Sequence, residues 1–318
     1  MVSATGVSGF SVEGLTLTGG TGENCYTTET CGGGLYLSSA SATLSNTTVS
    51  GNTAYDGGGL YLYYSSATLM GTTVADNTTS HDGGGLYLQY YSSVTLEDSE
   101  VSDNTAFYGG GLYLWSSSAT LEDSEVSGNT GYYVGGGLYL SDSSVTLTGT
   151  TVAGNNAGWD GGGLFLYYYS SVTLSNTTVS GNTADSWGGG LCLISPSSSA
   201  TLEDSEVSGN SADLGGGLYL QYYSSVTLED SEVSGNSADR YGGGLYLYDS
   251  SATLMGTTVA GNNAGWDGGG LYLWGGSVSV TSSDFIANLD EDVYHYYAGT
   301  AYDWGLAASF SCDTSSCY

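Results

Sequence analysis

The chain has 318 residues with 53 Gly, one Pro, 32 acidic side chains and a single basic one, Arg240, which gives a formal net charge of −31. Because cationic side chains are needed to bind nucleic-acid phosphates or to dock on an anionic membrane, this composition excludes both kinds of partner, and the absence of Lys excludes Lys-based catalysis. No apolar run approaches the roughly 18 residues that span a bilayer, so we expect no membrane insertion.

The N-terminal segment, residues 1–31, precedes the first full repeat. Its stretch from Phe10 to Gly20 predicts an incomplete coil that opens a stack of coils. Four of the five cysteines lie in the irregular ends, as the close pairs Cys25/Cys31 and Cys312/Cys317. We predict two small disulfides and an oxidising compartment, with free thiols as the alternative. A metal site made of all four cysteines would require the two ends to meet, which a stack of coils disfavours.

The central segment, residues 32–288, repeats one motif, Gly-Gly-Gly-Leu followed in nearly every copy by an aromatic residue and a second Leu. The first leucines follow one another at intervals of 25 to 27 residues, at Leu35, Leu60, Leu86, Leu112, Leu138, Leu164, Leu191, Leu218, Leu245 and Leu271. So constant a period indicates stacked supersecondary units. We therefore predict one solenoid, with residues 289–318 as a segment that caps it or joins it to another copy.

Each repeat contains three short segments that alternate in hydrophobicity. In the first repeat these are Leu35-Tyr36-Leu37, Ala42-Thr43-Leu44 and a stretch that ends at Val49. Alternation with period two places Leu on one face of a strand and Tyr or Thr on the other. The fold class that this predicts is an all-β, single-stranded, right-handed parallel β-helix of about ten coils, each coil stacked about 4.8 Å above the last.

An asparagine lies three residues after a valine in each repeat, or after Phe285 in the last one. Asn tolerates left-handed backbone angles, and in a stack in register its amide can bond to the next Asn or to its backbone. We therefore predict an internal, structural Asn ladder made of Asn52, Asn77, Asn104, Asn129, Asn155, Asn182, Asn210, Asn236, Asn262 and Asn288.

The pairing of Gly-Gly-x-apolar with aromatic-or-Val-x-x-Asn in every repeat resembles the polymorphic outer-membrane-protein repeats and the wider pectate-lyase-like right-handed β-helix surface proteins. The family's usual Gly-Gly-Ala-Ile and Phe-x-x-Asn stand here as Gly-Gly-Gly-Leu and Val-x-x-Asn, and only Phe285-Ile286-Ala287-Asn288 keeps the aromatic residue. The resemblance covers residues 32–288. It implies a secreted or surface-displayed protein of an often adhesive kind.

Two columns of aromatic residues are the most unusual feature of the repeats. The first, expected to point outward between inward leucines, contains Tyr36, Tyr61, Tyr87, Tyr113, Tyr139, Phe165, Tyr219, Tyr246 and Tyr272. The second follows directly and includes Tyr63, Tyr64, Tyr90, Tyr91, Trp115, Tyr167, Tyr168, Tyr169, Tyr222, Tyr223, Tyr248 and Trp274. Stacking alone could explain one column, but two exposed columns favour a partner, which could be a glycan, a second copy of the chain or the chain's own Tyr-rich tail.

Acidic clusters of the form Glu-Asp-Ser-Glu occur at one bend of some repeats. Two adjacent repeats place Glu97, Asp98 and Glu100 beside Glu122, Asp123 and Glu125. Facing like charges cost about 0.9 kcal/mol per pair even in water, and a divalent cation would relieve this cost. These residues are thus candidates for weak Ca²⁺ binding. Since other repeats have neutral residues in the same register, a hydrated acidic face is the favoured interpretation.

A few chemically active side chains stand alone in the sequence. His81 and His295 have no neighbour at metal-ligand spacing, and Cys192, which replaces a first-column aromatic, is expected to be an unpaired surface thiol. Arg240 is expected to be a solvated charge beside Asp239. No resident cofactor is expected, apart from the weak Ca²⁺ candidate.

These observations predict a non-enzymatic, extracellular or cell-surface β-solenoid with a structural or adhesive role, self-associating into a fibre through its ends or its Tyr-rich faces. A first alternative is a carbohydrate-binding module that uses the aromatic face to bind an extracellular glycan. A second is a polysaccharide lyase or hydrolase. The resemblance to pectate lyases implies basic residues for that chemistry, and a chain with one arginine and a large negative charge does not favour it.

Overall fold

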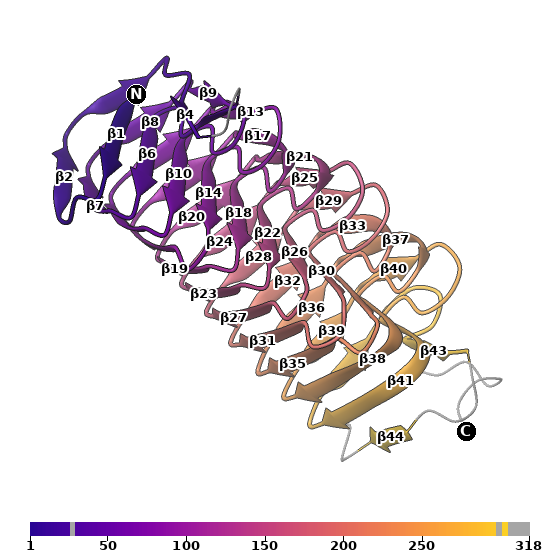
Figure 1. Cartoon of the computed structure of the whole chain (residues 1–318). Coiled ribbons are helices and arrows are strands. Elements are labelled where there is room, and N and C mark those ends of the chain that lie inside the picture. The colour runs from indigo at the N-terminus through magenta and orange to yellow at the C-terminus, as the bar shows by residue number, and fades with distance from the viewer. Residues whose placement is uncertain (26–28, 297–300, 305–318) are drawn as a thin grey trace. The chain divides into compact units, whose positions relative to one another are not determined.

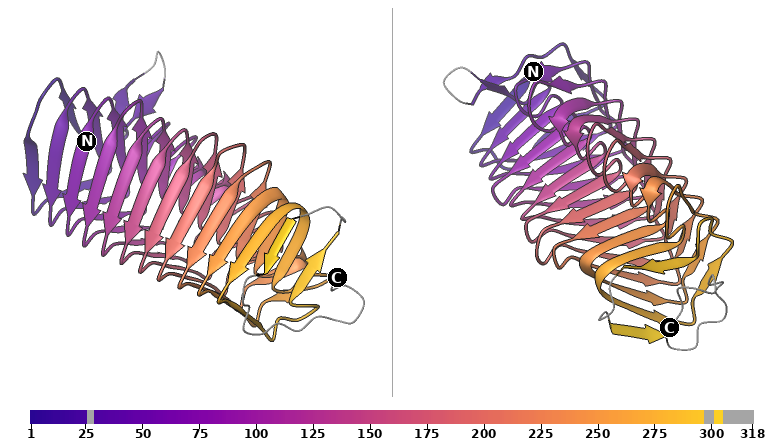
Figure 2. Two further views of the ribbon diagram at one scale, coloured as in Figure 1. Left: turned by 90° about the horizontal axis from the view of Figure 1, so that it is seen from below. Right: turned by 90° about the vertical axis from the view of Figure 1, so that its right-hand side faces the viewer.

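The computed structural model describes residues 1–25 and 29–296, together with the backbone of residues 301–304. Every regular element in these ranges is a β-strand, and none of the described residues belongs to a helix that could cross a membrane. The chain divides into two compact units, Met1–Ala157 and Gly158–Tyr318, each of which is a stack of coils with parallel strands side by side (Figures 1 and 2).

The first unit contains five full coils, each with four strands. The first strands are β6 (Leu35–Ser38), β10 (Leu60–Tyr63), β14 (Leu86–Gln89), β18 (Leu112–Trp115) and β22 (Leu138–Ser141). The second strands are β7 (Ser41–Ser45), β11 (Ser66–Met70), β15 (Ser93–Glu97), β19 (Ser118–Glu122) and β23 (Ser144–Thr148). The third strands are β8 (Thr48–Ser50), β12 (Thr73–Ala75), β16 (Glu100–Ser102), β20 (Glu125–Ser127) and β24 (Thr151–Ala153).

A short fourth strand follows the asparagine that recurs at the turn of each coil. This strand was not part of the predicted coil. The fourth strands of the five coils are β9 (Thr53–Ala54), β13 (Thr78–Thr79), β17 (Thr105–Tyr108), β21 (Thr130–Val134) and β25 (Asn156–Ala157). At two to five residues, this strand is too short to show an alternating pattern in the sequence. It matters for the site, because it leads the chain into the bend before Gly-Gly-Gly.

Equivalent strands of neighbouring coils pair in parallel and in register, as the repeat predicts. Leu60 is paired with Leu86, for example, and Thr68 with Thr95. The N-terminal residues form an incomplete coil in which β1 (Val2–Thr5), β2 (Phe10–Glu13) and β3 (Thr16–Thr18) pair with β6, β7 and β8. A small antiparallel hairpin, β4 (Glu23–Asn24) and β5 (Thr30–Cys31), precedes the first full coil.

The second unit repeats this coil and then extends it. Its first and second strands are β26 (Leu164–Tyr167), β27 (Ser171–Ser175), β30 (Leu191–Ile194), β31 (Ser199–Glu203), β34 (Leu218–Gln221) and β35 (Ser225–Glu229). Its third strands are β28 (Thr178–Ser180), β32 (Glu206–Ser208), β36 (Glu232–Ser234), β39 (Thr258–Ala260) and β42 (Asp284–Ile286). Its fourth strands are β29 (Thr183–Ala184), β33 (Ser211–Leu214), β37 (Ser237–Tyr241) and β40 (Asn263–Ala264).

In the last two coils of this unit, the first and second strands merge into single long strands, β38 (Leu245–Met255) and β41 (Leu271–Thr281). Beyond them, β43 (Val293–His295) and the backbone of β44 (Ala301–Trp304) each pair in parallel with β41.

The interior of each unit consists of columns of apolar side chains. Both leucines of the first strands and the valine of the third strands are buried, as are the Ala or Val and the Leu of the second strands; in the last coil Phe285 replaces the third-strand valine and Val280 replaces the second-strand leucine. Burying one Leu or Val side chain contributes about 1.5–3 kcal/mol, and parallel stacking repeats this gain in every coil. The inward positions thus follow the period-two pattern of the sequence.

The asparagines form an internal ladder in each unit. Asn77 illustrates the pattern: its backbone N–H and its Nδ2 both donate to Oδ1 of Asn104, at 3.0 Å each, and its Nδ2 also donates to the carbonyl of Val49. The same contacts join Asn104 to Asn129 and, in the second unit, Asn210 to Asn236. The ladder satisfies backbone groups at a turn that is buried and has no access to water.

The glycines before each first strand bend the chain back over that strand. Gly83, the first of its triplet, has φ of +63°, and an added Cβ would lie 2.9 Å from Cβ of Tyr87. The middle glycine, Gly84, packs against the backbone of Gly110 and Thr105 at distances that exclude any side chain. The bend therefore covers the aromatic residue of the strand that follows it.

Candidate functional site

The exposed aromatic surface of the first unit lies at the corner between the first and second strands. Tyr64, Tyr90, Tyr91 and Trp115 occupy this corner in three successive coils, and we call them the corner stripe. Tyr91 is 83% exposed and Tyr64 is 47% exposed. The rings contact one another: Tyr64 stacks on Tyr90 with centroids 5.7 Å apart, and Tyr90 lies 5.1 Å from Trp115.

Three of these residues have a backbone conformation that bulky side chains disfavour. The φ angles are +48° for Tyr64, +50° for Tyr90 and +57° for Tyr91, whereas the equivalent corners of other coils have Ser39, Ser116 and Asp142 in the same region. Left-handed angles cost a residue with a Cβ about 1–2 kcal/mol. Because Tyr91 is mostly exposed, burial of its ring does not offset this cost, and such uncompensated strain is typical of binding sites.

A groove of about 470 Å³ adjoins the corner stripe. Its walls include Tyr64, Tyr91, Val7 and Ala40, and its remaining lining consists of the serines Ser8, Ser39, Ser41, Ser65, Ser66 and Ser93 with Gly6. The lining combines aromatic faces with hydroxyl groups and contains no charged side chain. The second unit has an exposed counterpart of the stripe in Tyr168, Tyr169, Tyr222 and Tyr223.

The first aromatic column does not form a surface, contrary to the prediction. Tyr61, Tyr87, Tyr219, Tyr246 and Tyr272 are each less than 5% exposed. The rings stack on one another under the glycine bends, with Tyr113 and Tyr139 4.6 Å apart in the first unit and Tyr219 and Tyr246 5.0 Å apart in the second. Tyr36 stacks on Tyr61 at one end of its column. This column is packing, and the exposed rings at the corner between the first and second strands belong to the second column.

Cys192 is also buried, so the expectation of a surface thiol was wrong. It occupies the aromatic position of its strand, is fully buried and is a free cysteine. Burial raises the pKa of this thiol well above its usual value. The ring of Trp187, from the bend of the same coil, stacks on Tyr219 with centroids 5.1 Å apart, in the aromatic column that Cys192 interrupts.

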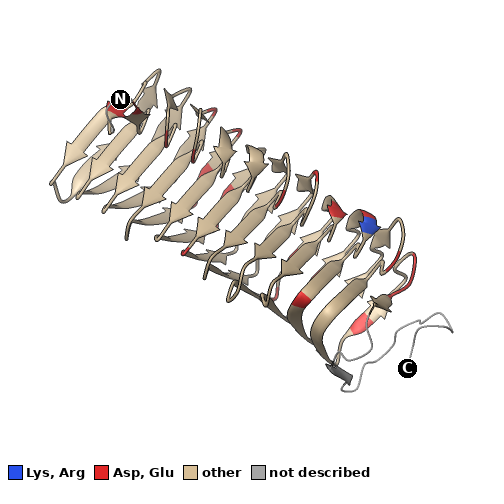
Figure 3. Cartoon of the chain, turned by 45° about the vertical axis from the view of Figure 1, so that its right-hand side comes forward, with Lys and Arg blue, Asp and Glu red and all other residues tan. Residues whose placement is uncertain are grey.

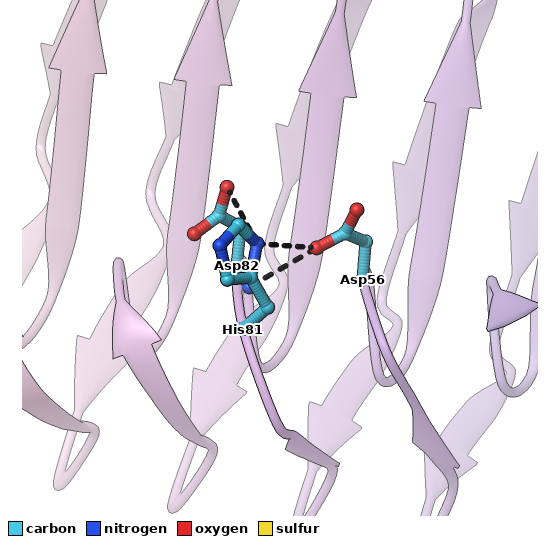
Figure 4. A group of neighbouring side chains, drawn as sticks. All are labelled: Asp56, His81 and Asp82. Atoms are coloured by element: carbon cyan, nitrogen blue, oxygen red, sulfur yellow. Dashed lines mark hydrogen bonds and ion pairs between the residues drawn. The ribbon is translucent and has the colours of Figure 1, made fainter. Parts of the chain in front are cut away.

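A cluster of ionisable side chains lies in the glycine bends of the first unit (Figure 4). Nδ1 of His81 is 3.1 Å from Oδ1 of Asp56, in the preceding coil, and 3.3 Å from Oδ2 of Asp82. The same Oδ1 of Asp56 accepts a hydrogen bond from the backbone N–H of Asp82 at 3.2 Å. The ring of Tyr55 stacks on the imidazole, with centroids 4.9 Å apart.

Burial changes the proton affinity of all three groups. Asp56 and Asp82 are 3% and 6% exposed. Desolvation raises the pKa of Asp56 to about 6, with a further rise from the neighbouring Asp82, and it also raises the pKa of Asp82. The hydrogen bond to Asp82 raises the pKa of His81 to about 9. The imidazole of His81, between Asp56 and Asp82, therefore keeps its proton to higher pH than a free histidine.

The cluster was not predicted, because Asp56 and His81 are 25 residues apart in the sequence. Asp56 and Asp82 precede successive Gly-Gly-Gly triplets and lie one repeat apart, which the repeat period alone would have aligned. His81 is the residue before Asp82. Among the described residues, these three form the only group of three or more His, Cys, Asp or Glu side chains whose ligand atoms lie within 4.8 Å of one another.

The acidic corners lie elsewhere in the coil. Glu97 faces Glu122 and Glu100 faces Glu125 in register across neighbouring strands, and Asp98 and Asp123 line an open hollow with Glu100 and Glu125. Their carboxylates do not converge in the way that those of Asp56 and Asp82 do. Most of the acidic residues visible in Figure 3 lie at bends between strands. Ca²⁺ binding at these corners stays a prediction.

Arg240 has a partner that the sequence did not suggest, whereas the predicted Cys25–Cys31 disulfide is confirmed. Arg240, the single blue residue in Figure 3, donates from Nε to Oδ1 of Asp213 in the preceding coil at 2.6 Å, rather than standing beside Asp239 alone. The disulfide between Cys25 and Cys31 is present, and it packs with Tyr36, Tyr61 and Tyr87 at one end of the buried aromatic column. Cys312 and Cys317 lie outside the described residues.

Comparison with known proteins agrees with this architecture. The family described as "Right handed beta helix region" matches residues 4–133 and 110–285, which together cover most of the chain. A search of curated proteins and a search of solved structures gave no match. The stacked parallel coils, the asparagine ladders and the family match together show that this chain belongs to the right-handed beta helix family.

Proposed function

We propose that this chain is a non-enzymatic, extracellular adhesive β-helix that binds neutral glycan chains along the corner stripe. The observation that carries the proposal is Tyr91, an aromatic side chain that is 83% exposed on a left-handed backbone. Neither burial nor backbone preference accounts for a tyrosine at this position. A ligand that stacks on the ring would account for it.

The chemistry of the groove indicates the class of ligand. Sugar rings present C–H faces that stack on aromatic rings and hydroxyl groups that exchange hydrogen bonds with serine side chains. The groove offers both, with Tyr64 and Tyr91 beside six serines. Because it has no charged side chain and the chain carries a net charge of −31, a neutral glycan is favoured over an anionic one.

The form of the stripe favours a polymer over a single sugar. Tyr64, Tyr90 and Trp115 come from three successive coils, and their rings follow one another in contact. Successive coils in a parallel β-helix are spaced about 4.8 Å apart, so the stripe runs along the stack. An extended ligand can therefore contact several rings at once.

The extracellular location and the absence of catalysis are parts of the same proposal. The Cys25–Cys31 disulfide is typical of proteins in an oxidising compartment. Other coils have neutral residues, such as Met70 and Thr148, in the register of the acidic corners, as expected for a surface that does no catalysis. The exposed face that distinguishes this chain is aromatic and polar, which suits adhesion.

Replacement of Tyr90 and Tyr91 by serine tests the proposal. On a glycan array we expect the wild-type chain to bind neutral polysaccharides and the double variant to lose about 10-fold or more of that affinity, since truncating a central aromatic residue of a binding surface costs about 2 kcal/mol or more. Tyr132→Ser is the matched control. Tyr132 is 57% exposed in the same unit but lies on β21, away from the corner.

Several outcomes would contradict the proposal. The proposal is wrong if the wild-type chain binds no glycan. It is also wrong if the double variant and the Tyr132 control lose equal amounts of glycan affinity. Sedimentation velocity on the same samples separates glycan binding from self-association through the Tyr face. A wild-type dimer that becomes monomeric in the double variant would identify a second copy of the chain as the partner of the stripe.

A further inference from the structure

We propose that Asp56, His81 and Asp82 form a binding site for one divalent transition-metal ion of the Zn²⁺ class. The site lies in the glycine bends, on a different part of the coil from the corner stripe, so the inference is independent of glycan binding. Its three donors are two carboxylates from successive coils and one imidazole between them (Figure 4).

The cluster occurs once in the repeats, although one of its components recurs. The residue before Gly-Gly-Gly is aspartate in four coils, at Asp56, Asp82, Asp160 and Asp267. Only Asp56 and Asp82 are one coil apart, and only Asp82 follows a histidine. Asp160 and Asp267 follow Trp159 and Trp266 and have no acidic neighbour at the equivalent position of the adjacent repeat. A role in folding the bend would not require this combination.

The distances between the donor atoms suit a bound ion. Metal–ligand bonds of about 2.0–2.2 Å at tetrahedral or octahedral angles place neighbouring ligand atoms about 3.0–3.5 Å apart. Nδ1 of His81 is 3.1 Å from Oδ1 of Asp56 and 3.3 Å from Oδ2 of Asp82. An ion can therefore replace the proton on Nδ1 without a large movement of the three side chains.

The two buried carboxylates and the unpaired oxygen of Asp82 also point to a cation. Asp56 and Asp82 are almost fully buried, and one Zn²⁺ could take an oxygen ligand from each of them. Oδ1 of Asp82 is buried and has no hydrogen-bond partner. An unsatisfied buried acceptor is costly, and a metal ion that draws in a bound water would satisfy it.

The residues around the cluster indicate which metals it could bind and from which side an ion could enter. The side chain of His81 is 42% exposed, which leaves one side of the cluster open for entry and for a water ligand. Tyr55 and Tyr108 flank the imidazole at centroid distances of 4.9 and 6.3 Å and hold its orientation. An imidazole nitrogen selects Zn²⁺, Co²⁺ or Ni²⁺ over Ca²⁺ and Mg²⁺, which prefer ligands that are all oxygen.

Calorimetric titration of the full chain with ZnCl₂ tests the site. Excess CaCl₂ and physiological salt are kept present to occupy and screen the acidic corners. We expect saturable binding of one Zn²⁺ at this site, and a visible absorption spectrum with CoCl₂ that reports nitrogen and oxygen ligands without a thiolate band. Asp82→Asn and His81→Gln should each weaken binding about tenfold or more. Asp160→Asn removes an equivalent isolated carboxylate and should leave binding unchanged.

The result that would overturn the proposal is binding of equal strength in the wild type and in both cluster variants, or no saturable binding at all. A cobalt spectrum with a thiolate band would also contradict it, because it would assign the ion to cysteine. Circular dichroism checks that each variant is folded. Asp56→Asn provides a third independent substitution if one of the others does not fold.

Discussion

Replacement of Gly110 by alanine is expected to destabilise the first unit more than any other single substitution considered for this chain. Gly110 is the middle glycine of its triplet, and an added Cβ would lie 2.5 Å from the carbonyl oxygen of Gly136 and 2.6 Å from the backbone of Thr130. All of these contacts are backbone atoms, which cannot rotate away. We expect a loss of about 4 kcal/mol or more in the free energy of unfolding, measured by urea denaturation followed by circular dichroism.

Gly154→Ala is the matched control for this prediction. Gly154 has φ of +62°, but an added Cβ would meet nothing within 4 Å. Only the backbone preference is lost, and the expected cost is about 1 kcal/mol. If the two substitutions had similar effects, close packing of coils at the glycine triplets would not explain why glycine is required there.

Replacement of Asn104 by alanine is the second prediction with a large effect. Oδ1 of Asn104 accepts from the backbone N–H and from Nδ2 of Asn77, and its Nδ2 donates to the carbonyl of Val74. Alanine would leave these buried groups without partners. Since each unsatisfied buried group costs about 1–3 kcal/mol, we expect a loss of roughly 3 kcal/mol or more in the free energy of unfolding.

Asn46→Gly provides the control for the ladder. Asn46 is an exposed asparagine at φ of +47°, a conformation that glycine adopts without strain. We expect a change of less than about 0.5 kcal/mol. A loss at Asn46 as large as that at Asn104 would contradict the assignment of the cost to the buried hydrogen bonds of the ladder.

The sequence was sufficient to predict the fold because every coil repeats the same constraints. Alternation in Leu35-Tyr36-Leu37 predicts a strand and its buried face, and the Val-x-x-Asn spacing predicts the buried turn at Asn52. Period and pattern say nothing, however, about what covers the other face of a strand. The glycine bend folds over Tyr61 and Tyr87, so residues that alternate outward are buried all the same.

The candidate sites were predicted less completely, for physical reasons that differ between them. Tyr90 and Tyr91 were identified because an aromatic pair at a corner stands out in the sequence. Their left-handed backbone, which separates them from packing residues, is visible only in the structure. Asp56 and His81 are 25 residues apart, and the coil stack alone brings them within 3.1 Å. Only an alignment of the repeats on Gly-Gly-Gly would have predicted that proximity.

The central claim is that the repeated columns are scaffold, so that function lies in the departures from the repeat. Hydrogen exchange read by mass spectrometry after pepsin digestion, which does not depend on Lys or Arg, tests it most directly. We predict that the slowest amides of the first unit recur with the repeat, at Asn52, Asn77 and Asn104, whose backbone N–H groups donate to the ladder. Exchange at these positions near the rate of an unfolded peptide, or slow exchange without the repeat spacing, would contradict the account.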